Sequence, residues 1–211
     1  MEIKYIEEIS STHNVLSNLI RDDEISKPFL LYAISQTDGI GSRGNSWESE
    51  YGNLFLSFSL SSNSLPHDLP VHSASIYFSW IVVEILRSYG SKVCLKWPND
   101  FYIKDKKLGG MITSKIKDFF VVSFGINFKT AKNEYSKLDV DVDICEFVAK
   151  LSSKLNNLPS WKHIFSNYEL EFSFSQKFFA HIDGKKISLK DAKLLNDGSI
   201  EIDSKKVYSL R

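Results

Sequence analysis

The chain is poor in cysteine and carries no excess of charge. Its 211 residues include two cysteines, Cys94 and Cys145, and both stand within apolar patterns. Because no secretion signal precedes them, we expect reduced thiols in a cytoplasmic protein rather than a disulfide framework. Lysine and arginine together number 26, as do aspartate and glutamate, so the formal net charge is zero. A protein that binds nucleic acid through overall positive charge is therefore not expected.

Long apolar runs, internal repeats and low-complexity tracts are also missing. No apolar run reaches the ~18 residues that a membrane-spanning helix needs, so we expect no membrane partner. The first expected strand begins near Ile3 and leaves no room ahead of it for a DNA-binding domain, so we expect no DNA partner. Core material is plentiful, because 43% of the residues are hydrophobic and 13% are aromatic. That is enough for one medium-sized domain, with or without a small appendage.

The pattern of apolar residues predicts a mixture of strands and helices over residues 1–175. Apolar residues alternate strictly from Gly52 to Leu60, which is typical of a strand. The segment from Val71 to Tyr89 is apolar nearly all round, which indicates a helix buried on most sides. Other expected strands cover residues 3–9, 29–35, 93–95, 111–116 and 119–128, and other expected helices cover residues 13–25, 144–155 and 161–174. We expect an α+β domain in which helices flank a mixed β-sheet.

The final stretch, residues 176–211, changes character. It contains four or so short apolar segments typical of strands. Asp183-Gly184 and Asp197-Gly198 stand between them and are strong signals for hairpin turns. We expect a second, small domain here, an SH3-like β-barrel docked on the main domain.

The densest group of candidate site residues lies in Lys96-Trp97-Pro98-Asn99-Asp100 and in Lys107-Leu108-Gly109-Gly110-Met111. A turn at Asp105-Lys106 would bring Lys107 back beside Asp100. The two glycines would leave the backbone bare, which suits a ligand lying against the main chain. One site could thus hold two ammonium groups, a carboxylate, an amide and a bare backbone. The alternative is an ordinary strand, turn and strand whose charges are solvated.

Three further groups are candidates for ligand contact. Ser11 and Thr12 precede an expected helix, and they either cap it or help its free N–H groups to bind a carbonyl or ureido oxygen. The glycine-rich segment from Gln36 to Trp47 suits a loop wrapped round an anion. The guanidinium group of Arg43 would donate paired hydrogen bonds to a phosphate or carboxylate. Otherwise it is a surface hairpin with Trp47 in the core. Asn127 ends an apolar strand, where it contacts a ligand or satisfies a nearby turn.

These motifs, in this order, resemble those of the biotin protein ligases, also called biotin–[acetyl-CoA-carboxylase] ligases. Lys96 to Asp100 matches the K-W-P-N-D signature of that family in full, and Lys107 to Met111 is similar to its K-x-x-G-I element. Four more segments are similar to family motifs: Ser11-Thr12 to the early Ser-Thr, residues 36–47 to Q-x-x-G-R-G-R-x-G-R-x-W, residues 52–54 to G-N-L and residues 125–127 to G-I-N. The resemblance covers nearly the whole chain. It implies a class II synthetase-like catalytic domain of the biotin and lipoate ligases, without a DNA-binding domain.

The resemblance also implies a two-step reaction. Biotin and ATP, with Mg²⁺, would give biotinyl-5′-AMP and pyrophosphate. The biotinyl group would then pass to one lysine of the biotin carboxyl carrier protein of acetyl-CoA carboxylase. No metal ligand from the protein is implied, and the chain could act as a monomer or a homodimer.

The family pattern assigns roles to residues of this chain. The catalytic residues would be Lys107, Asp100, Arg43 and Lys96. Lys107 would bridge the biotin carboxylate and the α-phosphate, and Asp100 would accept a proton from the acceptor amine or orient it. Biotin would contact Ser11, Thr12, Gln36, Gly41, Lys107, Gly109 and Gly110. ATP and the adenylate would contact Arg43, Trp47, Asn99, Lys107 and Asn127.

The glycine-rich loop departs from the family pattern. Three arginine positions hold other residues, namely Ile40, Ser42 and Asn45. Arg43 stands one place after the usual arginine, so it either shifts register to reach the phosphate or leaves that task to Lys96 and Lys107. A third possibility is weaker retention of the adenylate. His13, where the family often has Asn, is a milder change.

Two other functions stay open at this stage. The lost arginines fit a degenerate ligase that binds biotin without catalysis, although Lys107 and Asp100 are retained. A lipoate–protein ligase would share the fold class, but the intact K-W-P-N-D segment argues against it. Pyrophosphate release with biotin or with lipoate as the only acid separates these alternatives.

Overall fold

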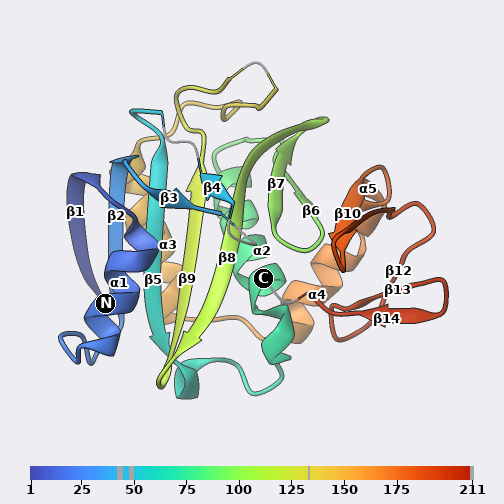
Figure 1. Ribbon diagram of the computed structural model, residues 1–211, viewed down its shortest axis with the longest axis horizontal. Helices are drawn as coiled ribbons and strands as arrows, with labels where there is room; N and C mark the ends of the chain where they lie inside the picture. Colours follow the sequence, from blue (N-terminus) through green and yellow to red (C-terminus); the bar gives the residue numbers. More distant parts are fainter. Residues whose placement is uncertain (42–44, 48–49, 133, 210–211) are drawn as a thin grey trace.

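The computed structural model describes residues 1–41, 45–47, 50–132 and 134–209. Within these ranges, seven strands form one sheet in the order β1-β2-β5-β9-β8-β7-β6 (Figure 1). β1 runs parallel to β2, and every other neighbouring pair is antiparallel, so the sheet is mixed as expected. The strands are β1 (Glu2–Ile9), β2 (Phe29–Gln36), β5 (Leu54–Ser61), β6 (Cys94–Lys96), β7 (Asp100–Ile103), β8 (Lys106–Ile116) and β9 (Phe119–Ile126).

Helices cover both faces of the sheet. α1 (Thr12–Arg21) lies on the near face in Figure 1, whereas α2 (Ala74–Arg87) and α3 (Ile144–Asn156) lie behind it. α4 (Trp161–Glu169) and the short α5 (Phe172–Ser175) lead on to the last part of the chain. In the part of the chain that is described, no helix combines the length and the apolar character needed to cross a membrane.

Three helices differ from the sequence prediction. The helix expected over residues 161–174 ends at Glu169, and after a turn at Leu170-Glu171 the short α5 follows. α1 ends at Arg21 rather than at residue 25, because Asp23 has φ 60°, a left-handed conformation that cannot continue an α-helix. The helix expected from Val71 begins as a 3₁₀ turn (Val71–Ser73) and becomes α-helical at Ala74. It is buried on nearly all sides, as its composition indicated.

The sheet is buried on both faces, with a separate apolar core on each. Leu54, Leu56 and Phe58 of β5 belong to the larger core, which includes α2. A smaller core joins Leu16 and Ile20 of α1 to β2, β8 and β9. Each fully buried side chain of this kind contributes roughly 1.5–3 kcal/mol. The residues of β5 that alternate with the leucines include Ser57, which faces α1 and becomes part of the site described below.

The last part of the chain folds into short antiparallel strands. β10 (Phe179–Ile182) pairs with β11 (Lys185–Ser188), and β13 (Ile200–Ile202) lies between β12 (Lys193–Leu194) and β14 (Lys205–Val207). Both predicted hairpin turns are present, and a third turn at Asp203-Ser204 was not predicted. These strands are consistent with an SH3-like domain. Among the described residues they form two small sheets, and no closed barrel is seen.

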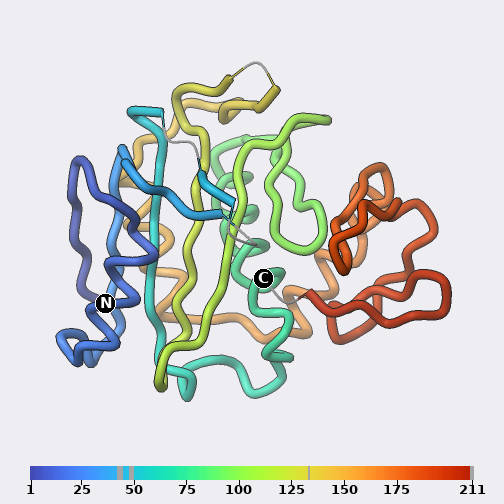
Figure 2. Tube along the Cα trace, in the orientation of Figure 1, coloured from blue at the N-terminus to red at the C-terminus, as the bar shows by residue number. Residues whose placement is uncertain are grey.

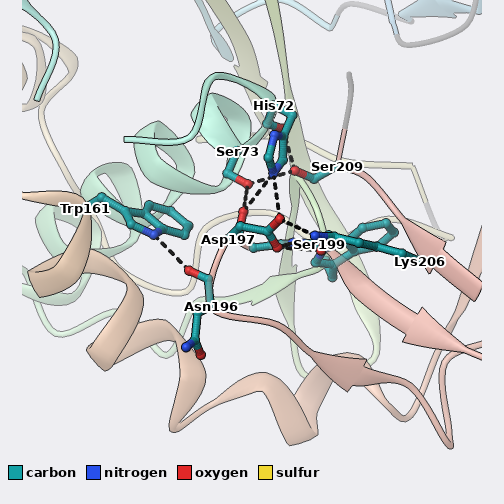
Figure 3. A network of polar contacts seen from close by, with 10 residues as sticks. His72, Ser73, Trp161, Asn196, Asp197, Ser199, Lys206 and Ser209 are labelled. Carbon is teal, nitrogen blue, oxygen red and sulfur yellow. Dashed lines mark hydrogen bonds and ion pairs between the residues drawn. The ribbon is translucent and has the colours of Figure 1, made fainter. Parts of the chain in front are cut away.

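The final strands lie beside the β7 and β6 edge of the sheet, at the opposite end from β1 (Figure 2). The turn at residues 196–198 makes several polar contacts there (Figure 3). The backbone oxygen of Asp197 accepts hydrogen bonds from Ser73 and His72 at the start of α2. Trp161 Nε1 donates to Asn196 O at 3.0 Å, and Trp97 Nε1 donates to Gly198 O at 3.0 Å. The end of the chain is thus joined to the segment that the sequence analysis singled out.

Candidate active site

Two lysines and one aspartate form a charged cluster where β6, β7 and β8 meet. Lys107 Nζ lies 2.8 Å from Asp100 Oδ1, and Lys96 Nζ lies 3.2 Å from Asp100 Oδ2. The predicted approach of Lys107 to Asp100 is confirmed. The connecting turn falls at Lys104-Asp105, one residue earlier than predicted, because Lys104 adopts φ 54° and Lys106 already belongs to β8. The Asp100 side chain is 19% exposed, so solvated charges on an ordinary hairpin do not describe this cluster.

The Asp100 carboxyl is held ionised by its neighbours. Burial alone would raise its pKa, but the ammonium groups of Lys107 and Lys96 outweigh burial and hold the pKa below its ordinary value. A carboxylate with a lowered pKa is a weak base. Each of its two oxygens contacts an ammonium group, so Asp100 balances the charge of Lys96 and Lys107.

Gly109 and Gly110 of β8 are needed for different structural reasons. A Cβ at Gly109 would collide with the carbonyl oxygen of Gly125 on β9, so Gly109 is needed for the two strands to pair closely. A Cβ at Gly110 would lie 3.2 Å from Asp100 Oδ1 and 3.5 Å from Lys107 Nζ. Gly110 thus leaves room for the ion pair. Both glycines also line the cavity described below.

A chain of hydroxyl groups lies on the α1 side of the sheet. Gln36 Oε1 accepts from Thr12 N at 2.8 Å and from Thr12 Oγ1 at 3.1 Å. The Ser57 hydroxyl is 2.9 Å from Thr12 Oγ1 and 2.8 Å from Ser123 Oγ, and Ser123 Oγ is 2.8 Å from His13 Nδ1. The structure brings Thr12 and Gln36 together as predicted. Ser57 and Ser123 were missed as site residues, although Ser123 is the one serine in the apolar strand β9 and was a signal.

Ser11 caps α1 as predicted, because its hydroxyl accepts from Asn14 N at 3.4 Å. Its side chain is almost fully buried and lines the same cavity as Thr12. Burial lowers the pKa of the nearby His13 ring, and the positive charge of Arg21 adds to this, so the ring is neutral near pH 7.

The glycine-rich segment forms a small hairpin over the cavity, with β3 (Gly39–Ile40) paired to β4 (Ser46–Trp47). Trp47 lies against Gly125, where an added Cβ would come within 2.9 Å of the indole ring. Lys107 Nζ is 5.7 Å from the centre of that ring. Trp47 Nε1 is buried and has no hydrogen-bond partner among the described residues. Gly41 closes the hairpin through a hydrogen bond to Asn45 O, whereas Ser42 and Arg43 lie outside the described residues.

The predicted asparagines are both engaged in holding backbone. The Asn99 amide donates to Met111 O, and Met111 N returns a hydrogen bond to Asn99 O at 2.9 Å. Asn127 Nδ2 donates to Ser136 O at 3.1 Å. Asn53, which lies in the predicted G-N-L match but was given no site role, shapes the same loop, since its Oδ1 accepts from Lys129 N at 3.0 Å. Asn127 therefore satisfies a nearby backbone carbonyl, which was one of the two alternatives predicted for it. It also borders the cavity.

A cavity of about 460 Å³ joins the charged cluster to the hydroxyl groups. That volume is typical of sites for small ligands. Its lining includes, from the predicted set, Ser11, Thr12, Gln36, Gly41, Trp47, Asn99, Asp100, Lys107, Gly109, Gly110 and Asn127. Lys96 is not part of that lining and reaches the site through Asp100.

The sequence profile of the Biotin/lipoate A/B protein ligase family matches residues 5–130. The chain belongs to this family. The "Bifunctional ligase/repressor BirA" of Escherichia coli (strain K12) is 35% identical over 135 residues, which are 61% of this chain and 41% of that protein. This chain therefore spans less than half the length of that curated relative.

Solved structures of ligases match over nearly the whole chain. The biotin acetyl coenzyme A carboxylase synthetase of Helicobacter pylori, described with bound biotinylated ATP, gives a TM-score of 0.93 at 35% identity and covers 98% of this chain and 99% of the other. The biotin protein ligase of Aquifex aeolicus, in complex with biotin and ATP, gives 0.78 at 23% identity over 100% and 96%. The second match shows the shared fold alone. Together they confirm the predicted ligase fold.

Proposed function

We propose that this member of the family is an ATP-dependent biotin–protein ligase that makes biotinyl-5′-AMP and transfers the biotinyl group to a carrier lysine. One observation carries the proposal. A cavity of ligand size has the Lys107–Asp100 ion pair, supported from behind by Lys96, at one end and a buried hydroxyl network at the other. Biotin has a carboxylate at one end and a cyclic urea at the other, and so offers the matching chemistry. The similarity to the Helicobacter pylori synthetase supports this choice of acid.

In the first step, a carboxylate oxygen of biotin attacks the α-phosphorus of ATP, and the bond to pyrophosphate breaks. Negative charge gathers at the attacking and leaving oxygens, and preorganised positive groups usually supply the largest catalytic effect. Lys107 would bridge the carboxylate and the α-phosphate. Lys96, held by Asp100, would raise the positive potential of the site. Magnesium would accompany ATP and offset the negative charge of its phosphates, and the described residues include no group of three or more His, Cys, Asp or Glu side chains that could hold a metal ion.

In the second step, the amine of the acceptor lysine attacks the acyl carbon and AMP leaves. The amine must lose a proton, and Asp100 would orient it without itself being a strong base. We propose the biotin carboxyl carrier protein of acetyl-CoA carboxylase as the acceptor and the cytoplasm as the location. The chain would act as a monomer or a homodimer.

Binding roles follow the two ends of the cavity. Ser11, Thr12, Gln36 and Gly41 would hold the biotin head group, and Gly109 and Gly110 would lie along its chain. Trp47 would stack on adenine, with Asn127 and Asn99 at its edge or at the ribose. Asn99 would act mainly through the backbone that it holds, since its amide is already bonded to Met111 O. Arg43 would retain the adenylate. The catalytic domain would cover residues 1–175 and the SH3-like domain residues 176–211.

The test is pyrophosphate release by the purified chain with ATP, magnesium and a single acid. Biotin is expected to support release, and lipoate is not. Release with lipoate alone would indicate a lipoate–protein ligase. Tight biotin binding without release would indicate a binding protein that has lost catalysis. Labelled biotin and purified carrier domain then test the transfer step.

A further inference from the structure

Three aromatic side chains, Tyr102, Phe174 and Phe178, form a group at the edge of the sheet nearest the last strands. The ring centre of Tyr102 on β7 lies 4.6 Å from that of Phe178 and 6.2 Å from that of Phe174 on α5. The rings of Phe174 and Phe178 are 5.0 Å apart. All three residues are half-buried, and none belongs to either apolar core. Rings that pack on one another outside a core and stay in contact with water are typical of a surface that binds another protein.

This aromatic group begins beside the charged cluster. Asp100 and Tyr102 are alternate residues of β7 and are half-buried, whereas Phe101 and Ile103 are buried. The Asp100 carboxylate and the Tyr102 ring therefore share one face of the strand. Lys96 Nζ, which contacts Asp100, also lies 5.6 Å from the centre of the Tyr102 ring.

Tyr135 marks the outer rim of the cavity, because it lines the cavity and is 42% exposed. Burial raises the pKa of the Tyr102 phenol to about 12, and the nearby Asp100 and Tyr135 add to this effect, so the rim reaches the aromatic group. A folded acceptor protein is too large for a cavity of about 460 Å³. It must stay outside while its lysine side chain enters, and the aromatic group lies where such a protein would rest.

Charge is distributed unevenly along the sheet. Residues 92–107, which include β6, β7 and the start of β8, contain five lysines and two aspartates. Residues 176–209 contain seven lysines and five acidic residues, whereas residues 1–41, which include β1 and β2, contain three basic and seven acidic residues. The two ends of the sheet lie apart (Figure 1). The end that carries the aromatic group therefore attracts an acidic partner, and the β1 end repels it.

We propose that the aromatic group, together with Lys177, is the docking surface for the acceptor protein, which presents apolar side chains and acidic residues around its lysine. Lys177 is exposed, and its Nζ lies 5.8 Å from the centre of the Phe174 ring. The inference rests on the proposed function and deepens it, because it says where the acceptor docks and what surface it carries. A nucleic acid would also meet basic and aromatic groups here, but the zero net charge of the chain favours a protein.

The test measures biotinyl transfer to the purified carrier domain in parallel with transfer to hydroxylamine, a small nucleophile that needs no docking. We expect Phe178→Ala to raise the KM for the carrier domain about tenfold. Lys177→Glu should raise it about fivefold and weaken its dependence on salt. Neither variant should alter the rate with hydroxylamine, since neither residue lines the cavity. Tyr5→Ala and Lys27→Glu are the matched controls, because they remove an exposed ring and reverse an exposed charge at the β1 end.

An unchanged KM for the carrier domain in both variants, or an equal change in the controls, would overturn the docking surface. An equal loss with hydroxylamine would overturn it too, because the residues would then support the site itself. Loss of oligonucleotide binding in the variants, with transfer unchanged, would assign the surface to nucleic acid instead. Lys177→Glu changes an exposed side chain, so it stays informative even if Phe178→Ala folds poorly. An unaltered chain that gives no product with hydroxylamine would overturn the proposed function, whereas one that gives product but responds to neither variant would overturn the docking surface alone.

Discussion

Asp100 is the residue on which the charged end of the cavity depends, and its surroundings were largely predictable. Its pairing with Lys107 follows from a short hairpin, and its pairing with Lys96 follows from the four-residue separation across the Pro98 bend. The hydroxyl end was only half predictable. Ser57 and Ser123 are 66 residues apart, and they meet because β5 pairs with β9 in a register that places them opposite each other. A single sequence does not reveal that register.

The first residue-scale prediction concerns Lys107. Lys107→Ala should slow adenylate formation about a hundredfold or more, because loss of one preorganised charge typically costs about 3 kcal/mol of transition-state stabilisation. Lys107→Arg should restore little of this rate, since the planar guanidinium group does not replace a compact ammonium group beside Gly110. Single-turnover measurement of adenylate formation checks both variants.

Lys115→Ala is the matched control, because Lys115 is an exposed lysine of the same strand, away from the cavity lining. Its rate should stay close to that of the unaltered chain. Similar rates for Lys107→Ala and Lys115→Ala would remove Lys107 from the catalytic machinery.

At the scale of elements, the turn at residues 196–198 holds the start of α2, the start of α4 and the Trp97 segment together. Gly198 has φ 79°, and a Cβ there would collide with Ser73. The Asp-Gly pair predicted the turn, but not what it contacts. Contacts between remote segments depend on how the last strands dock, and local sequence patterns do not report docking.

We predict that Trp97→Phe destabilises the protein more than Trp80→Phe does. Both indoles are almost fully buried. Trp97 Nε1 donates to Gly198 O, whereas Trp80 Nε1 has no partner among the described residues. Only the first change leaves a buried carbonyl unpaired, so the difference in the free energy of unfolding should be about 1–2 kcal/mol. Urea denaturation measures it, and equal losses would show that the Trp97 hydrogen bond contributes nothing.

The second element-scale prediction concerns pH. Burial alone would raise the pKa of Asp197, but hydrogen bonds and charge from Lys206 and Ser199 lower it to about 2. A lowered folded-state pKa gives stability that is present above the ordinary value near 4 and is lost as the pH falls towards 2. Asp197→Asn should therefore reduce the free energy of unfolding by roughly 1–2 kcal/mol at pH 6, and by progressively less between pH 4 and pH 2.5. A difference that grows on acidification would contradict this assignment.

At the scale of the whole molecule, the SH3-like strands share the larger core of the sheet. Leu189, Ala192 and Ile200 belong to the same apolar cluster as the helices behind the sheet. The sequence predicted the mixed sheet and the short final strands, because alternation and turn signals are local. It did not predict that the two small sheets would stay separate, since barrel closure depends on pairings between distant strands.

A shared core predicts a single cooperative transition on heating. Far-ultraviolet circular dichroism, which follows the helices, should give the same midpoint as histidine signals of His181 on β10 followed by NMR. Two separate midpoints would show that the last strands unfold independently of the catalytic sheet.

The hydrogen bond between Trp97 and Gly198 has a consequence for the newly made chain. It joins residues 101 positions apart, and Gly198 leaves the ribosome long after the strands around Asp100. At ~5–20 residues per second, that interval lasts about 5–20 s. During this time, the segment carrying Lys96 and Asp100 lacks its contact with Gly198. We infer that the charged cluster reaches its final geometry late in biosynthesis, which would delay any synthesis of a reactive acyl-adenylate by an unfinished polypeptide.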